Sequence, residues 1–207
     1  QPLVLLRGEM IPASQASIAI FDAGLVMGAT VTDMARTFGK RLFRIDDHVE
    51  RFFASLAAVG FDVPVQPQQL QDQLTDLVTT NAKLIHEDDE LTLCLFATAG
   101  ELARYAGHDD VRTGPTLCAH TFPLSFELWG RAVESGVHLV TPSVAQLPAN
   151  CIDPAIKHRS RLHYYLATRE SQQTSPGSVP LLLDQRGNVT ETVSANLLIV
   201  NDGTIVS

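Results

Sequence analysis

The sequence predicts an α+β protein of two layers or two domains. Two segments in the first half, 45–61 and 66–84, repeat apolar residues at the spacing of amphipathic helices. Apolar runs at 91–99 and 115–122 predict buried strands, and short strand-like runs separated by turn residues fill 179–207. Helices and strands in this irregular order favour an α+β arrangement, because regular alternation is absent. A chain of 207 residues can form one large or two small domains.

The elements before the first long helix are short. Residues 3–6 predict a strand, and the chain then turns between Asp22 and Gly24 before a short helix. A hairpin is expected around the Gly39-Lys40 pair, because strand-like residues flank it on both sides.

Both long helices carry identifiable signals. The helix over 45–61 has Asp46 or Asp47 as a candidate N-cap, and Gly60 is expected to end it. The helix over 66–84 predicts a buried apolar face made of Leu70, Leu74, Leu77 and Val78.

The second half is predicted to begin with a linker between domains at 123–130, whose aromatic residues indicate that it is packed. A strand at 136–142 and a helix at 161–172 follow. The end of the chain predicts four strands, at 179–184, 189–192, 195–200 and 204–207. Turns are expected at "QRGN" and "NDG".

The composition excludes several classes of protein. Apolar residues make up 45% and charged residues 18%, a globular mixture, and the net charge of −8 without a basic stripe argues against nucleic acid as a partner. No apolar run approaches the roughly 20 residues of a membrane span, and the first residues do not lead us to expect a signal peptide. Three cysteines without a C-x-x-C pair predict neither a zinc site nor disulfides, and favour a reduced, cytoplasmic setting. The acidic stretch at 86–90 is interpreted as a solvated loop, so no metal site is expected.

Lys157 is one of only three lysines, and it stands among His158, Arg159 and Arg161. Like charges and the partial burial expected after Pro154 would both disfavour its ammonium form. A fraction of free amine could then form a Schiff base with a carbonyl group. The alternative is an ordinary surface lysine.

Glu191 and Arg51 are the next candidates. Glu191 lies on a predicted strand beside an apolar run, where a buried carboxylate would need a cationic partner such as a protonated pyridine nitrogen; an exposed strand residue is the alternative. Arg51 either pairs with Asp47 one helical turn earlier or turns its guanidinium toward a phosphate. An amine, a ring-nitrogen partner and a phosphate arginine are the groups that a pyridoxal 5'-phosphate enzyme requires.

Three motifs strengthen this hypothesis. The pattern D-x-x-G-x-V-T-E-x-x-x-x-N runs from Asp184 to Asn196, "DDHVERF" contains Arg51, and "FDAGLVMG" contains Asp22. Together with Lys157, these motifs resemble the class IV pyridoxal-phosphate aminotransferases, in order and over nearly the whole chain. That family comprises branched-chain aminotransferases, D-amino acid aminotransferases and 4-amino-4-deoxychorismate lyases.

The resemblance implies a two-domain fold. A small N-terminal α/β domain would occupy 1–122, an interdomain linker 123–130, and a larger cofactor-binding domain built around a pseudo-barrel 131–207. This larger domain is incomplete here, because family chains continue well past the last residues of this sequence. The resemblance also implies a cofactor in the cleft between the domains and a homodimer.

Carried over residue by residue, the resemblance assigns five residues to the cofactor, pyridoxal 5'-phosphate. Lys157 would be the catalytic Schiff-base lysine and would carry the proton. Glu191 would keep the pyridine nitrogen protonated, and Arg51 would bind the phosphate. Arg161 and Ser194 would be further cofactor-binding residues.

Three functions remain open. The first is an aminotransferase acting on an amino acid and an oxo acid. The second is a lyase, because "KHRSRL" resembles the lyase pattern and Leu162 stands where branched-chain enzymes tend to have Tyr. The third is a non-catalytic homologue that serves as a binding or dimerisation module, for which the unusual stretch "GATVTD" at 28–33 leaves room.

Overall fold

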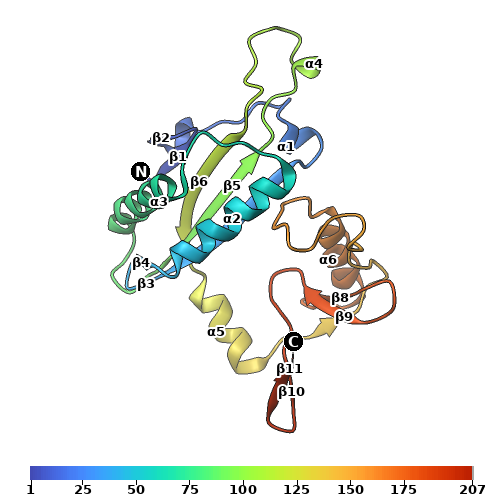
Figure 1. The fold of residues 1–207 in the computed structure, drawn as a ribbon. Coiled ribbons are helices and arrows are strands. Elements are labelled where there is room, and N and C mark those ends of the chain that lie inside the picture. The colour runs from blue at the N-terminus through green and yellow to red at the C-terminus, as the bar shows by residue number, and fades with distance from the viewer. Residues whose placement is uncertain (207) are drawn as a thin grey trace. The chain divides into compact units, whose positions relative to one another are not determined.

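The computed structural model describes residues 1–206, which form two compact units (Figure 1). The first unit consists of Gln1–Leu124 together with Ala155–Ser160. The second consists of Ser125–Pro154 and the chain from Arg161 onward. The domain boundaries expected from the sequence stay a prediction.

A six-stranded antiparallel sheet forms the centre of the first unit, in the order β2-β1-β6-β5-β3-β4. Its longest pairing joins β5 to β6. The predicted strands and the hairpin around Gly39-Lys40 are confirmed, whereas β2 was not expected from the sequence. The strands are β1 (Leu3–Leu6), β2 (Glu9–Pro12), β3 (Thr30–Phe38), β4 (Arg41–Leu42), β5 (Leu91–Thr98) and β6 (Thr116–Pro123).

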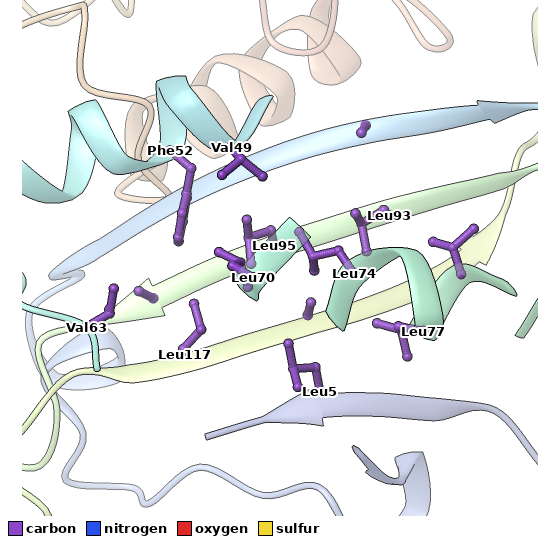
Figure 2. Packing of buried hydrophobic residues seen from close by; sticks show 14 of the residues in the cluster. Leu5, Val49, Phe52, Val63, Leu70, Leu74, Leu77, Leu93, Leu95 and Leu117 are labelled. Atoms are coloured by element: carbon purple, nitrogen blue, oxygen red, sulfur yellow. The ribbon is translucent and has the colours of Figure 1, made fainter. Parts of the chain in front are cut away.

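Helices α2 (Ile45–Val59) and α3 (Pro67–Asn81) cover one face of this sheet (Figure 1). Figure 2 shows Phe52 of α2 and Leu70, Leu74 and Leu77 of α3 among the leucines of the strands. All four side chains are fully buried, which confirms the predicted apolar face of the second helix. Burying one such side chain contributes about 1.5–3 kcal/mol, so this core holds the helices against the sheet.

The start of α2 differs from the expectation. The residue preceding the helix is Arg44, in a left-handed conformation, and it makes no side-chain cap. The prediction that Asp46 or Asp47 is the N-cap is therefore wrong. Both carboxylates lie in the first turn instead, where they interact favourably with the positive end of the helix dipole. Gly60 ends the helix at φ 72°, as predicted.

Short helices complete the first unit. The predicted turn after Asp22 is confirmed, because this carboxylate caps α1 (Ala23–Val26) by accepting a hydrogen bond from the Gly24 amide at 2.7 Å. Its other oxygen accepts from the Thr98 hydroxyl at 2.9 Å, which ties the turn to β5. The remaining elements are the 3-10 helices η1 (Ala13–Gln15) and η2 (Ala82–Leu84), and α4 (Ala103–Ala106).

The second unit is built around a three-stranded sheet in which β7 pairs in parallel with β8 and β8 pairs antiparallel with β9. A separate hairpin joins β10 to β11. Helix α5 was not expected, because its residues begin inside the predicted linker at 123–130. The elements are α5 (Phe126–Ser135), β7 (Leu139–Val140), α6 (Leu162–Thr174), β8 (Val179–Leu183), β9 (Val189–Thr192), β10 (Ile199–Asn201) and β11 (Thr204–Val206).

The predicted strands at 179–184, 189–192 and 204–207 are confirmed, although residue 207 lies outside the described residues. The prediction of a strand over 195–200 is wrong for most of its length, because the Thr192 hydroxyl holds the chain in a turn up to Ala195 and β10 begins only at Ile199. Within residues 1–206, no helix combines the length and the apolar character needed to cross a membrane.

Candidate active site

The Lys157 segment belongs to the first unit, where its backbone is held on two sides. The Lys157 carbonyl accepts a hydrogen bond from the Thr32 amide at 2.8 Å, and the Lys157 amide donates to the Ser55 hydroxyl of α2 at 3.2 Å. An antiparallel bridge between Val31 and His158 continues this contact. The edge of β3 can accept the segment here, because β4 pairs only with the far end of that strand.

Two further contacts hold the residues that follow. The Arg159 amide donates to the Thr30 hydroxyl at 3.1 Å, and the Ser160 hydroxyl donates to the Gly28 carbonyl. The guanidinium of Arg159 lies 4.9 Å from the ring centre of Phe96, a favourable cation–π arrangement. The segment thus follows the N-terminal half of β3 residue by residue.

The side chain of Lys157, in contrast, is exposed. The expectation that it is partly buried is wrong, because the short segment on the strand edge leaves its side chain uncovered. Its Nζ makes no hydrogen bond or ion pair within residues 1–206. A fixed backbone with an unpartnered amine is an arrangement suited to a reactive lysine.

Arg51 projects from α2 toward β3, where Asp33 is only 1% exposed. Arg51 Nε donates to Asp33 Oδ2 at 2.7 Å and Nη2 donates to Oδ1 at 2.8 Å. His48 Nδ1 lies 2.7 Å from Oδ1. The alternative pairing of Arg51 with Asp47 is wrong, because Asp47 pairs with Arg44.

These contacts shift the pKa values of both partners. Burial by itself would raise the pKa of Asp33, but the hydrogen bonds from His48 and Arg51 outweigh burial and lower it. The hydrogen bond to Asp33 raises the pKa of Arg51 against the opposing effect of burial. The guanidinium therefore stays charged in a fixed orientation, with its Nη1 donors outside the pair.

Glu191 lies on β9 in the second unit and is half-buried. Its Oε1 accepts from the Tyr164 hydroxyl at 2.6 Å and from Gln146 Nε2 at 2.9 Å. Burial, followed by the hydrogen bond to Glu191, raises the pKa of Tyr164. Within residues 1–206, the other oxygen, Oε2, has no hydrogen-bond donor.

The other predicted site residues are both exposed. The guanidinium of Arg161 donates to the Val193 carbonyl and lies 4.6 Å from the ring centre of Tyr164. Ser194 sits in a tight turn closed by Thr192, whose hydroxyl accepts the Ala195 amide at 2.8 Å. Their cofactor contacts stay a prediction.

Sequence reasoning did not assign a role to Ser55, Tyr164 or Gln146. One signal was available for Ser55, because it lies one helical turn after Arg51 and is a polar residue on the buried face of α2. No comparable signal marks Gln146, which reaches Glu191 across 45 residues from an irregular segment.

The fold is of α+β type, and the described chain forms two compact units. The family model described as "Amino-transferase class IV" matches residues 30–207, and the chain belongs to this family. The predicted family and fold class are therefore confirmed.

Relatives among characterised sequences support the same assignment. The chain is 26% identical over 202 residues to a D-alanine aminotransferase of Bacillus licheniformis, covering 98% of this chain and 66% of that protein. It is 26% identical over 210 residues to "Branched-chain-amino-acid aminotransferase-like protein 1" of Arabidopsis thaliana, covering 99% of this chain and 36% of that protein. The chain thus spans about two thirds or less of the length of these relatives.

Solved structures share the fold. The branched-chain amino acid aminotransferase of Escherichia coli has a TM-score of 0.86 at 20% identity, over 99% of this chain and 66% of that chain. The enzyme of Thermobaculum terrenum, solved in its PLP-form, has a TM-score of 0.78 at 18% identity, over 98% of this chain and 65% of that chain.

Proposed function

We propose that the protein is a pyridoxal 5'-phosphate-dependent aminotransferase that acts on an amino acid through a Schiff base with Lys157. Membership of the class IV family and the relatives' names support this proposal. The observation that carries it is the exposed Lys157 amine, unpartnered within residues 1–206, on a backbone fixed by Thr32 and Ser55.

Each unit contains side chains with the chemical groups that would bind pyridoxal 5'-phosphate. In the first unit, Lys157 offers an amine for the aldehyde, and Arg51 offers the Nη1 donors of an oriented guanidinium for the phosphate. In the second unit, Glu191 offers its second carboxylate oxygen, Oε2, for a protonated ring nitrogen. Arg161 and Ser194 remain predicted contacts.

The bound cofactor would supply an electron sink for the charge that develops when the substrate Cα loses a proton. Lys157 would form the Schiff base and would be released as a free amine when the amino group of the substrate replaces it. The free amine would then take the proton from Cα and return it at another carbon. Glu191 would hold the ring nitrogen protonated. Arg51 would anchor the phosphate, which keeps the reacting atoms in place.

Labelling of the full-length protein tests the role of Lys157. The protein is incubated with pyridoxal 5'-phosphate, reduced with borohydride and digested, and the modified peptide is identified by mass spectrometry. We expect the label on Lys157 in the wild type and in Lys83→Ala, whose lysine is also exposed, and its loss in Lys157→Ala. A label shared equally with Lys83, or no label at all, would refute the proposal.

A lyase is the second candidate, favoured by the "KHRSRL" segment in which Arg161 and Leu162 follow Lys157. Product analysis separates the two reactions. An aminotransferase forms an oxo acid only as it transfers an equal amount of amino groups, whereas the lyase releases pyruvate without an acceptor. A non-catalytic homologue would give neither product with any amino donor.

The assembly and the setting of the protein also remain predictions. We expect a homodimer in the cytoplasm that uses small amino acid and oxo acid substrates. Sedimentation of the full-length protein checks the dimer.

A further inference from the structure

The carboxylate of Glu191 is held by a small polar network in the second unit. Gln146 is at its centre, because its Nε2 lies 2.9 Å from both Glu191 Oε1 and the Tyr164 hydroxyl. Its Oε1 lies 3.0 Å from His163 Nε2. Three separate segments meet here: an irregular stretch before residue 150, the first turn of α6, and β9.

The chemistry of these groups fixes the direction of each hydrogen bond. A carboxylate only accepts, so the NH2 group of Gln146 must face Glu191 and its carbonyl must face His163. His163 therefore carries a proton on Nε2. Tyr164 donates its only proton to Glu191 at 2.6 Å, the short distance expected for a hydroxyl bonded to a carboxylate.

The members of the network are themselves anchored. The backbone N–H of Gln146 donates to the backbone carbonyl of Leu183 at 2.9 Å, and Gln185 Nε2 donates to the backbone carbonyl of Gln146 at 2.8 Å. The guanidinium of Arg161 lies over the Tyr164 ring. The two donors thus hold one carboxylate oxygen in a defined position.

We propose that Tyr164 and Gln146 are positioning residues that orient Glu191 toward the pyridine nitrogen of the cofactor. Two donors occupy both lone pairs of Oε1, so Oε2 is the acceptor that remains for the ring. This inference rests on the proposed function. It goes beyond that function by assigning roles to two residues that do not touch the cofactor.

The orientation matters because a carboxylate that rotates freely spends part of its time facing away from the ring. A hydrogen bond to a charged group is worth about 1.5–3 kcal/mol, which corresponds to roughly a tenfold or greater change in affinity. Removing one donor should therefore weaken cofactor binding measurably, while Glu191 itself stays in place.

Binding of pyridoxal 5'-phosphate to the cofactor-free, full-length protein tests the proposal, with Kd measured by absorbance. The neighbouring Tyr165 provides the control, because it lies on the same helix, is 64% exposed and makes no side-chain hydrogen bond to any of residues 1–206. We expect Tyr164→Phe to raise Kd about tenfold and Gln146→Leu to raise it by a similar factor. Tyr165→Phe should change it by less than about twofold.

A double-mutant cycle separates positioning from a general structural effect. Glu191→Gln should raise Kd, and adding Tyr164→Phe to it should raise Kd by less than about twofold further, because the group being positioned is already altered. If Tyr164→Phe raises Kd by the same factor in Glu191→Gln as in the wild type, the proposal is overturned. Equal Kd values for Tyr164→Phe and Tyr165→Phe would also overturn it.

An alkaline absorbance titration of the cofactor-free protein reads the network without the cofactor. The hydrogen bond to Glu191 helps to raise the pKa of Tyr164, so Glu191→Gln should lower the pH at which Tyr164 ionises, and Tyr164→Phe identifies the part of the titration that belongs to Tyr164. If Tyr164 ionises at the same pH in wild type and Glu191→Gln, the proposal fails. If the wild type binds no cofactor, both the proposed function and this inference fail, whereas equal Kd values in the wild type, Tyr164→Phe and Gln146→Leu, with a raised Kd in Glu191→Gln, refute the inference alone.

Discussion

Asp33 and Arg51 form a two-point ion pair between strand β3 and helix α2, with donor–acceptor distances of 2.7 and 2.8 Å. The carboxylate is buried, whereas the arginine side chain is 50% exposed. The buried partner therefore fixes the exposed one, because the planar fork of a guanidinium matches a carboxylate in one orientation. Contacts within the chain itself therefore hold Arg51 in place.

Replacing Asp33 with asparagine should destabilise the protein by about 2 kcal/mol at pH 7, because the charged carboxylate that accepts two hydrogen bonds from Arg51 becomes a neutral amide. Asp47→Asn is the matched control, since Asp47 pairs with Arg44 at the surface and should change stability by less than about 0.5 kcal/mol. Urea unfolding of both variants checks this prediction. Equal stabilities would show that Asp33 does not hold Arg51.

The contribution of Asp33 should also depend on pH. Its pKa is lowered in the folded protein, so its stabilising effect is fully present above the unfolded pKa of about 3.9. That effect is lost as pH falls through the folded value. The difference in unfolding free energy between wild type and Asp33→Asn should therefore be constant near neutral pH and shrink below about pH 4. A difference that stays unchanged down to about pH 3 would contradict the assignment.

The sequence predicted the long elements because local patterns determine them. The buried face of α3 follows from the spacing of Leu70, Leu74 and Leu77, and the turn after Asp22 follows from its capping chemistry. The cap of α2 was mispredicted, because Asp46 and Asp47 satisfy the same local rule and the backbone at Arg44 decided where the helix begins.

The candidate site was predicted only in part. The motifs identify Lys157, Arg51 and Glu191, yet the partners of these residues come from distant segments. Ser55 reaches Lys157 across 102 residues, and no local pattern encodes such a contact. The exposure of Lys157 was also missed, because burial depends on which strand edge its segment follows.

Gly100 provides a test of the packing beside β5. A Cβ atom at this position would lie 2.2 Å from the Gly114 carbonyl oxygen, and its φ of 94° already disfavours other residues. Gly100→Ala should destabilise the protein by more than about 3 kcal/mol or prevent folding, since backbone atoms cannot move away cheaply.

Gly107→Ala is the control for this prediction. Gly107 has a similar left-handed backbone at φ 73°, but no atom of the described residues lies within 4 Å of its added Cβ. Gly107→Ala should therefore lower the stability only by the backbone strain, about 1 kcal/mol. Thermal unfolding of the two variants compares them, and similar melting temperatures would show that the Gly114 carbonyl is not a rigid obstacle.

Ser55 links Lys157 to helix α2, and removing its hydroxyl should loosen the segment that contains Lys157. Ser55 is 2% exposed, and its hydroxyl accepts the Lys157 amide at 3.2 Å. Ser55→Ala leaves that amide without its acceptor, which should cost about 1 kcal/mol in stability. The same change should raise the hydrogen-exchange rate of the Lys157 amide about fivefold or more, as measured by NMR.

Thr80→Ala is the control for Ser55→Ala, because Thr80 is an exposed residue on α3 whose hydroxyl makes no hydrogen bond within the described part of the chain. It should leave exchange at Lys157 unchanged. The Thr32 amide still donates to the Lys157 carbonyl in both variants, so the segment should stay on the strand edge and only its helix side should open. Faster exchange at Thr32 as well would mean that the whole segment has detached, and that Ser55 holds the strand contact in addition to the lysine.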